Sequence, residues 1–164
     1  MTVPARPRGT ASRGADEVSD LDKRIIEHLQ QDGRRPFTQI AAELGVSEAA
    51  VRARTNRLVE RGILQVVGVT DPLKLGFQQQ AMIGVRCERD RLLQVSEAVS
   101  AFPEVDYVVI TAGTFDLLIE VVCENNEALL HFLTEKLRAV DGVRETETFV
   151  YLRMVKQTYQ WGTR

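Results

Sequence analysis

Apolar positions recur at helical spacing from residue 20 onward. Their four-residue repeat predicts a first helix that begins at Asp20, which can cap it, and stops at Asp32-Gly33. A second helix is predicted over 36–44 and a third over 48–61, with Ser47 as the N-cap of the third. Because a glycine follows each of the last two helices, we expect three short helices around one small core.

After residue 62 the pattern becomes that of β-structure. Residues 63–69 are rich in β-branched side chains and are broken at Gly68, which predicts a short hairpin or wing before a connector. Strands are predicted over 81–87, 105–111, 116–124 and 143–155, and helices over 92–102 and 126–140. Asn126 is expected to cap the second of these helices, whose apolar positions are Leu130, Leu133, Leu137 and Val140. The order β-α-β-β-α-β is the ferredoxin-like arrangement, in which both helices cover one face of an antiparallel sheet.

The other face of this sheet is also expected to carry apolar side chains. We assign to it Val108, Ile110, Leu118, Val122, Phe149 and Tyr151. An apolar sheet surface without a helix above it predicts a partner, most simply a second copy of the chain. The pattern therefore predicts an α+β protein that self-associates through its sheet.

The composition changes this picture little. Of 164 residues, 44% are hydrophobic and two are cysteines without CxxC spacing, which argues against a disulfide scaffold, a zinc module or a membrane protein. His28 and His131 lack further ligands at metal spacing, so no metal and no cofactor are predicted. Residues 1–19 have no apolar core of a secretory signal and predict a mobile tail on a cytoplasmic protein. The expected divisions are tail 1–19, helical domain 20–64, wing and linker 65–79, and sheet domain 80–164.

Charge is unevenly distributed along the chain. Residues 20–64 carry eight Lys and Arg against seven Asp and Glu, whereas residues 65–164 carry ten against fourteen. The positive charge concentrates in 45–64, which holds Arg52, Arg54, Arg57 and Arg61. Such a stretch is compatible with contact to phosphate groups, but taken alone it is more often a solvated helix face.

The spacing of three residues favours the second reading. Ala41, Gly45 and Val51 place a small residue, a turn glycine and a branched residue where a helix-turn-helix needs them. The third helix then turns away from the core a face of small, cationic and amide side chains, which the major groove of DNA accepts: Ala49, Arg52, Ala53, Asn56 and Arg57.

The run LDKRIIEHLQQDGRRPFTQIAAELGVSEAAVRARTNRLVERGIL, followed by TAGTFDLLIEV in the sheet domain, resembles the Lrp/AsnC family of transcriptional regulators. The resemblance implies an N-terminal winged helix-turn-helix, a β linker and an amino-acid-binding domain that dimerises through its sheet and assembles into tetramers or octamers. It also implies that residues 47–61 form the recognition helix. The residues that it implies for contact with double-stranded DNA are Thr38, Ser47, Glu48, Ala49, Arg52, Asn56 and Arg57.

The family also has a Gly-acidic-Tyr-Asp turn that helps to form an effector pocket at a subunit interface. Here the turn reads Gly113-Thr114-Phe115-Asp116, so a charge and a hydroxyl are lost and the effector preference of relatives is not carried over. Backbone N–H groups of such a turn suit a carboxylate, and Asp116 suits an ammonium group. The effector-binding residues expected from the resemblance are Thr111, Ala112, Gly113, Thr114, Phe115 and Asp116, with Thr146 and Thr148 from a neighbouring subunit.

Three functions remain open at this point. The first is a DNA-binding regulator that responds to a small amino-acid-like effector. The second is an architectural DNA-binding protein whose turn binds nothing. The third is a dimeric α+β barrel enzyme, but that function leaves residues 45–61 unexplained, and the sheet domain shows no convergent catalytic group. We therefore expect a regulator and not an enzyme.

Overall fold

The structure is a computed structural model, and it describes residues 17–158 and 162–163. It divides into a helical unit that ends at Gly68 and a sheet unit over Val69–Lys156, with the residues from Gln157 onward grouped with the helical unit. Most of the predicted tail lies outside the described residues. Its last part does not behave as a tail, because Val18 packs on the helical core. No helix in the described ranges has the length and apolarity needed to cross a membrane.

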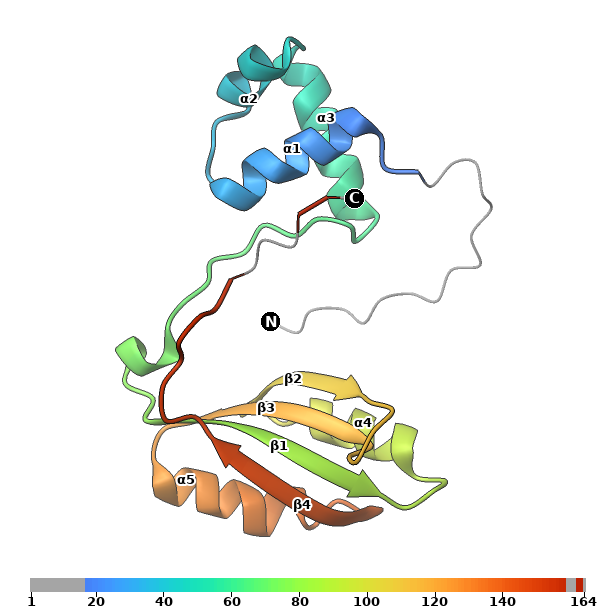
Figure 1. Cartoon of the computed structure of the whole chain (residues 1–164), viewed down its shortest axis with the longest axis vertical. Helices are drawn as coiled ribbons and strands as arrows, with labels where there is room; N and C mark the ends of the chain where they lie inside the picture. The colour runs from blue at the N-terminus through green and yellow to red at the C-terminus, as the bar shows by residue number, and fades with distance from the viewer. Residues whose placement is uncertain (1–16, 159–161, 164) are drawn as a thin grey trace. The chain divides into compact units, whose positions relative to one another are not determined.

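The helical unit consists of α1 (Asp20–Gln31), α2 (Phe37–Leu44) and α3 (Glu48–Glu60) (Figure 1). Gly45 ends α2 with φ of 68°, a left-handed conformation that glycine adopts without a Cβ clash. The three predicted helices are confirmed. The buried core between them contains Ile25, Ile26, Leu29, Ile40, Ala41, Val51, Leu58 and Leu64.

The N-cap of α1 differs from the prediction. Ser19 occupies that position, its hydroxyl accepts from the Asp22 N–H, and the Asp22 carboxylate accepts from the Ser19 N–H in return. This reciprocal capping box satisfies two N–H groups, whereas Asp20 in the first helical turn makes only a surface ion pair with Lys23 at 3.8 Å.

The predicted wing is absent, because residues 61–71 contain no strand. Val66, Val67 and Val69 are all more than half exposed. Branched side chains favour extended backbone, but a strand also needs a partner, and no described segment pairs with this one. The connector that follows contains a short 3₁₀ helix, η1 (Pro72–Leu75).

The sheet unit has four antiparallel strands in the order β2-β3-β1-β4. The strands are β1 (Gln79–Cys87), β2 (Val105–Ile110), β3 (Leu117–Cys123) and β4 (Val143–Val150). Figure 1 shows α4 (Leu92–Ser100) and α5 (Asn126–His131) on the same side of the sheet. Helix α5 continues as a π-helical segment, η2 (Phe132–Leu137). The ferredoxin-like prediction is confirmed.

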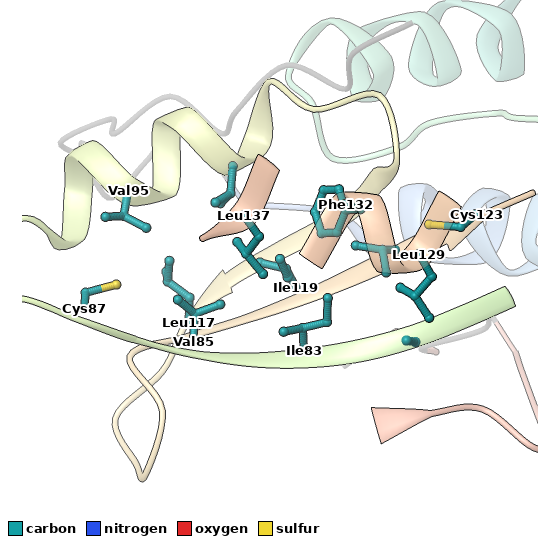
Figure 2. Packing of buried hydrophobic residues seen from close by; sticks show 13 residues of the cluster. Ile83, Val85, Cys87, Val95, Leu117, Ile119, Cys123, Leu129, Phe132 and Leu137 are labelled. Atoms are coloured by element: carbon teal, nitrogen blue, oxygen red, sulfur yellow. The ribbon is translucent and has the colours of Figure 1, made fainter. Parts of the chain in front are cut away.

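The core of this unit lies between the sheet and its helices (Figure 2). Alternate residues of β1 and β3 point into it, and all of β3 follows a strict buried and half-buried alternation. Val95 of α4 and Phe132 and Leu137 of η2 are fully buried against them. The second sheet face is left without a covering helix, as the period of two predicted.

Three details of the sheet unit correct the prediction. Asn125, not Asn126, caps α5, since its side chain accepts from the Ala128 N–H. Leu130 is 61% exposed instead of buried. The final strand ends at Val150, five residues earlier than predicted.

Two residues assigned to the open face belong to the other face. Val108 pairs with the buried Ile119, and Ile110 pairs with the buried Leu117, so both lie on the helix-covered side. The cause is a register shift in β2 between Val105 and Tyr107, which reverses the facing of the residues beyond it.

Candidate DNA interface and effector turn

The outward face of α3 is accessible in the helical unit. Ala49, Arg52, Ala53 and Asn56 are exposed, and together with Glu48 they line a shallow hollow. Val51, Thr55 and Leu58 point into the core from the other side of the helix. Because two residues of the outward face are alanines, the backbone of α3 can approach a surface closely while Arg52 and Asn56 extend past it.

The other predicted DNA contacts surround this face. Ser47 is the N-cap of α3, with its hydroxyl accepting from the Ala50 N–H at 3.2 Å. Thr38 on α2 and Arg57 near the end of α3 are both exposed. The seven predicted residues therefore all belong to α2, to α3 or to the turn between them.

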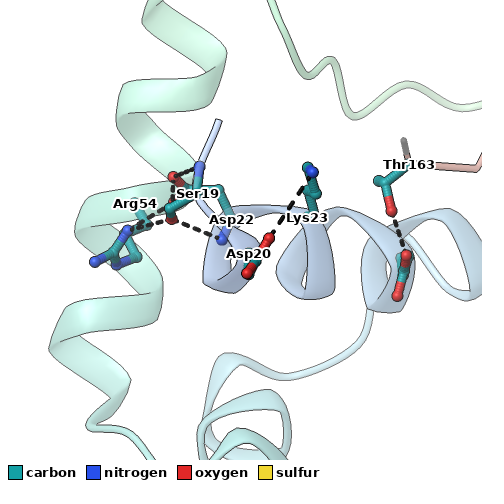
Figure 3. Close-up of polar contacts among 7 residues, drawn as sticks. Ser19, Asp20, Asp22, Lys23, Arg54 and Thr163 are labelled. Atoms are coloured by element: carbon teal, nitrogen blue, oxygen red, sulfur yellow. Dashed lines mark hydrogen bonds and ion pairs between the residues drawn. The ribbon is translucent and has the colours of Figure 1, made fainter. Parts of the chain in front are cut away.

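One arginine of the positive stretch has a structural role instead. The Arg54 Nη1 atom donates to Asp22 Oδ1 at 2.9 Å and to the Ser19 hydroxyl at 3.1 Å, which joins α3 to the start of α1 (Figure 3). Asp22 is only 4% exposed. Burial alone would raise the pKa of its carboxyl, but the hydrogen bonds from Ser19 and Arg54 outweigh burial and lower the pKa. The sequence pattern had assigned Asp22 no role.

The Arg52 side chain is fixed from two sides. Its guanidinium carbon lies 5.2 Å from the centroid of the Phe37 ring, and its Nη2 atom pairs with the Glu48 carboxylate. Arg52 nevertheless keeps 58% of its side-chain surface exposed. It is thus an ordered cation that remains available to a ligand.

The predicted effector turn, residues 111–116, is held by hydrogen bonds to the main chain. The Thr111 N–H donates to the Asp116 carbonyl, and the Asp116 N–H donates to the Val85 carbonyl, both at 2.9 Å. The Asp116 Oδ2 atom accepts from the Cys87 N–H at 2.8 Å. One oxygen of the expected ammonium partner is therefore used to anchor the turn to β1.

Phe115 folds over the open face of the sheet. A Cβ atom at Gly84 would lie 2.6 Å from the Phe115 ring, so this position of β1 accommodates only glycine beneath the ring. The ring also contacts Phe149 edge-on at 6.3 Å, and Arg86 lies over it at 5.6 Å. Arg86 further donates to the Thr114 carbonyl at 3.1 Å, which fixes the turn above β1.

Thr146 and Thr148 do not join this turn within one chain. They pair with Val85 and Ile83, whose side chains are buried on the helix-covered face, while Phe115 lies on the opposite face. Thr146 instead lines a separate hollow with Arg138, Val143, Arg144 and Glu145. Ala112, Gly113 and Thr114 are exposed at the tip of the turn.

The remaining candidate chemistry has structural explanations. Cys87 and Cys123 are buried free thiols, and burial raises the pKa of both. His28 is not simply solvated, because its Nδ1 atom lies 2.8 Å from Arg35 Nη1 and 3.7 Å from the Glu43 carboxylate. These groups form no catalytic arrangement.

Comparisons with known proteins cover both units. Residues 18–59 match the AsnC-type helix-turn-helix domain, and residues 80–161 match the Lrp/AsnC ligand binding domain. The chain is 36% identical to the HTH-type transcriptional regulator PH0140 of Pyrococcus horikoshii over 89% of this chain and 90% of that protein.

Solved structures agree with this assignment at the level of the fold. The Escherichia coli AsnC structure aligns with a TM-score of 0.78 at 24% identity, covering 86% of this chain and 96% of that one. The regulator NMB0573 of Neisseria meningitidis, solved as a complex with L-Met, aligns with a TM-score of 0.78 at 23% identity over 87% and 95% of the two chains. With both domains matched in order, the chain belongs to the Lrp/AsnC family and is a transcriptional regulator, not an enzyme.

Proposed function

We propose that α3 enters the major groove of double-stranded DNA and that its outward face reads the operator. The observation that carries this proposal is the exposed combination of Ala49, Arg52 and Asn56 on one side of a capped helix. Arginine pairs with guanine and asparagine with adenine, and alanine allows close approach. Ser47, Glu48, Thr38 and Arg57 flank this surface. We also propose that the protein acts in the cytoplasm, where a regulator of this kind reaches DNA.

The open sheet face supports assembly into at least a dimer. Apolar side chains on this face include Met82, Leu118 and Val122, together with Tyr107 and Phe149, which are 50% and 46% exposed. Burying this surface against a second copy removes apolar area from water. A dimer, and equally a tetramer or octamer, presents several recognition helices to one operator.

A small amino-acid-like effector is the ligand that we propose for the sheet unit. The unit matches a ligand binding domain, and the relative NMB0573 was solved with L-Met. The exposed tip at Ala112, Gly113 and Thr114 offers main-chain groups to a carboxylate. Because Thr146 and Thr148 lie on the other sheet face, they complete such a site only from a neighbouring subunit. Binding alters regulation only if the effector prefers one assembly or DNA-binding state over another.

The first experiment tests both halves of the proposal. Operator duplexes are selected from a random library with the purified chain, and a thermal-shift screen against the standard amino acids identifies ligands that stabilise the native state. Selected DNA together with a selective amino acid whose addition changes DNA affinity or oligomer size supports the regulator. Selected DNA without any amino-acid response would favour the architectural alternative, and failure to select DNA would contradict the DNA-binding proposal.

The role of Asp116 needs an isosteric substitution. Asp116→Ala removes the acceptor that anchors the turn to the Cys87 N–H, so it disrupts the turn whether or not the carboxylate touches a ligand. Asp116→Asn keeps an oxygen acceptor but removes the charge. If the carboxylate pairs with the effector ammonium, Asp116→Asn loses effector binding, whereas an anchoring role alone leaves binding near the wild-type level.

A further inference from the structure

The Arg52 guanidinium contacts two side chains, one from α2 and one from α3. The ring of Phe37, at the start of α2, lies against the guanidinium at 5.2 Å. Glu48, one turn earlier on α3, takes the Nη2 atom in an ion pair. Phe37 is itself half-buried on the core of the helical unit, so the ring is a fixed platform.

This arrangement leaves the donors that matter for base recognition available. A guanidinium that stacks on an aromatic ring keeps its N–H groups in the plane, pointing away from the ring. Among the contacts of the described residues, Nη2 is the only Arg52 atom with a hydrogen-bond partner. Two further donors suit the O6 and N7 atoms of guanine, which arginine contacts bidentately.

Arg54, two residues further along α3, is held in a different way. Arg54 is tied to Asp22 and Ser19 across the helix packing interface. Arg86 also lies over an aromatic ring, that of Phe115, but in the sheet unit. Unlike Arg54, Arg52 therefore combines a ring contact and an ion pair with a side chain that is 58% exposed.

We propose that Arg52 reads a single guanine of the operator and that Phe37 and Glu48 are the positioning residues that set its guanidinium for that base. This inference rests on the proposed DNA-binding function. Phe37 lies outside the recognition helix and acts on specificity only through Arg52. A stacked, paired guanidinium loses little freedom on binding, so the energy of its two hydrogen bonds discriminates between bases.

Glu48 gives the proposal its sharpest consequence. When α3 enters the groove as proposed, the Glu48 carboxylate adds a negative charge beside polyanionic DNA, so it weakens binding to any DNA sequence while it positions Arg52. Removing it should therefore raise affinity for random-sequence DNA and lower discrimination at one base pair. A residue with a purely structural role would not move these two quantities in opposite directions.

The test measures dissociation constants of the full chain for its selected operator and for versions substituted at each base pair. At one G·C pair, the wild type should discriminate by about tenfold or more, and Arg52→Ala should lose that discrimination. Phe37→Leu and Glu48→Ala should each reduce it by about threefold or more at the same pair only. Phe37→Tyr, which keeps the ring, should retain it.

Matched controls separate positioning from charge and folding. Glu60→Ala removes a carboxylate from the other end of α3, away from Arg52, and should leave the discrimination unchanged. Thermal unfolding of each variant shows whether the helical unit is intact. The proposal is overturned if folded Phe37→Leu and Glu48→Ala proteins discriminate like the wild type. A wild-type chain that binds no duplex would instead overturn the proposed function itself.

Discussion

Asp22 is the charged residue that joins the helices of the DNA-binding unit. Its carboxylate caps α1 through Ser19 and accepts from Arg54 of α3, so one buried group serves both a helix end and a helix contact. The sequence alone showed four arginines in one basic stretch and could not separate their roles. The fold separates them because Arg54 faces α1 while Arg52 faces outward.

Arg54→Ala should destabilise the helical unit by about 2 kcal/mol at neutral pH, because the buried Asp22 carboxylate loses a charged hydrogen-bond partner. The pKa of Asp22 is lower in the folded chain than its ordinary 3.8. Its stabilising effect is therefore complete above that value and is lost as the pH falls through the folded pKa.

Urea unfolding followed by far-UV circular dichroism checks this prediction. The difference in free energy of unfolding between the wild type and Arg54→Ala should be largest at neutral pH and should become smaller below pH 3.8. Arg57→Ala, which removes an exposed arginine from the same helix, serves as the control. An equal difference at neutral and acid pH would show that the Asp22 charge is not involved.

At the scale of elements, the helix after β3 shows where a regular period misleads. The apolar pattern of residues 126–140 predicts Leu130, Leu133, Leu137 and Val140 as the inward positions. The structure buries Leu137 and packs Leu133 and Val140 against the core, as predicted, but it exposes Leu130 and buries Leu129 and Phe132, which the pattern did not assign. The five-residue step from Phe132 to Leu137 matches the π-helical segment η2, in which each turn holds more residues than in an α-helix.

Phe132→Ala should therefore lower the free energy of unfolding by about 3–5 kcal/mol, since the ring is fully buried and contacts Phe102 edge-on at 5.7 Å. Leu130→Ala should change it by about 0.5 kcal/mol or less, because its side chain is mostly in solvent. Urea titration of the two variants makes the comparison. Similar losses of unfolding free energy for both variants would mean that Leu130 is covered, for example by another subunit. Measuring oligomer size during the same titration would test that explanation.

At the scale of the whole molecule, basic and acidic groups separate along the chain. The positive stretch lies in the helical unit, and residues 65–164 carry the excess of acidic groups. Local positive charge on α3 attracts DNA despite a net charge of −2. Affinity for DNA should then fall steeply with salt, because counterions are released from the phosphates.

Arg57→Ala should weaken binding to all DNA sequences about equally and should reduce the salt slope by about one, as expected for a phosphate contact. Arg52→Ala should instead weaken the operator more than random DNA. Fluorescence anisotropy over a range of salt concentrations measures both effects. A sequence-selective loss in Arg57→Ala would reassign that residue to base recognition.

Apart from the wing, the sequence alone determined the main helices and strands and their order. Local sequence predicted the helical and period-two patterns, the Gly45 turn and the Ser47 cap, because each depends on neighbours a few residues away. The ferredoxin-like topology and the outward face of α3 followed from these local features. The resemblance carried by those segments also identified the family.

Tertiary structure decided which side chains meet. The Arg54 contact with Asp22, the Phe115 ring over Gly84 and the Phe37 platform under Arg52 all join different elements. The facing of Val108 depends on a register shift in β2, and a one-residue slip moves a side chain to the other sheet face. Such contacts depend on how elements pack in space, which local periodicity does not encode.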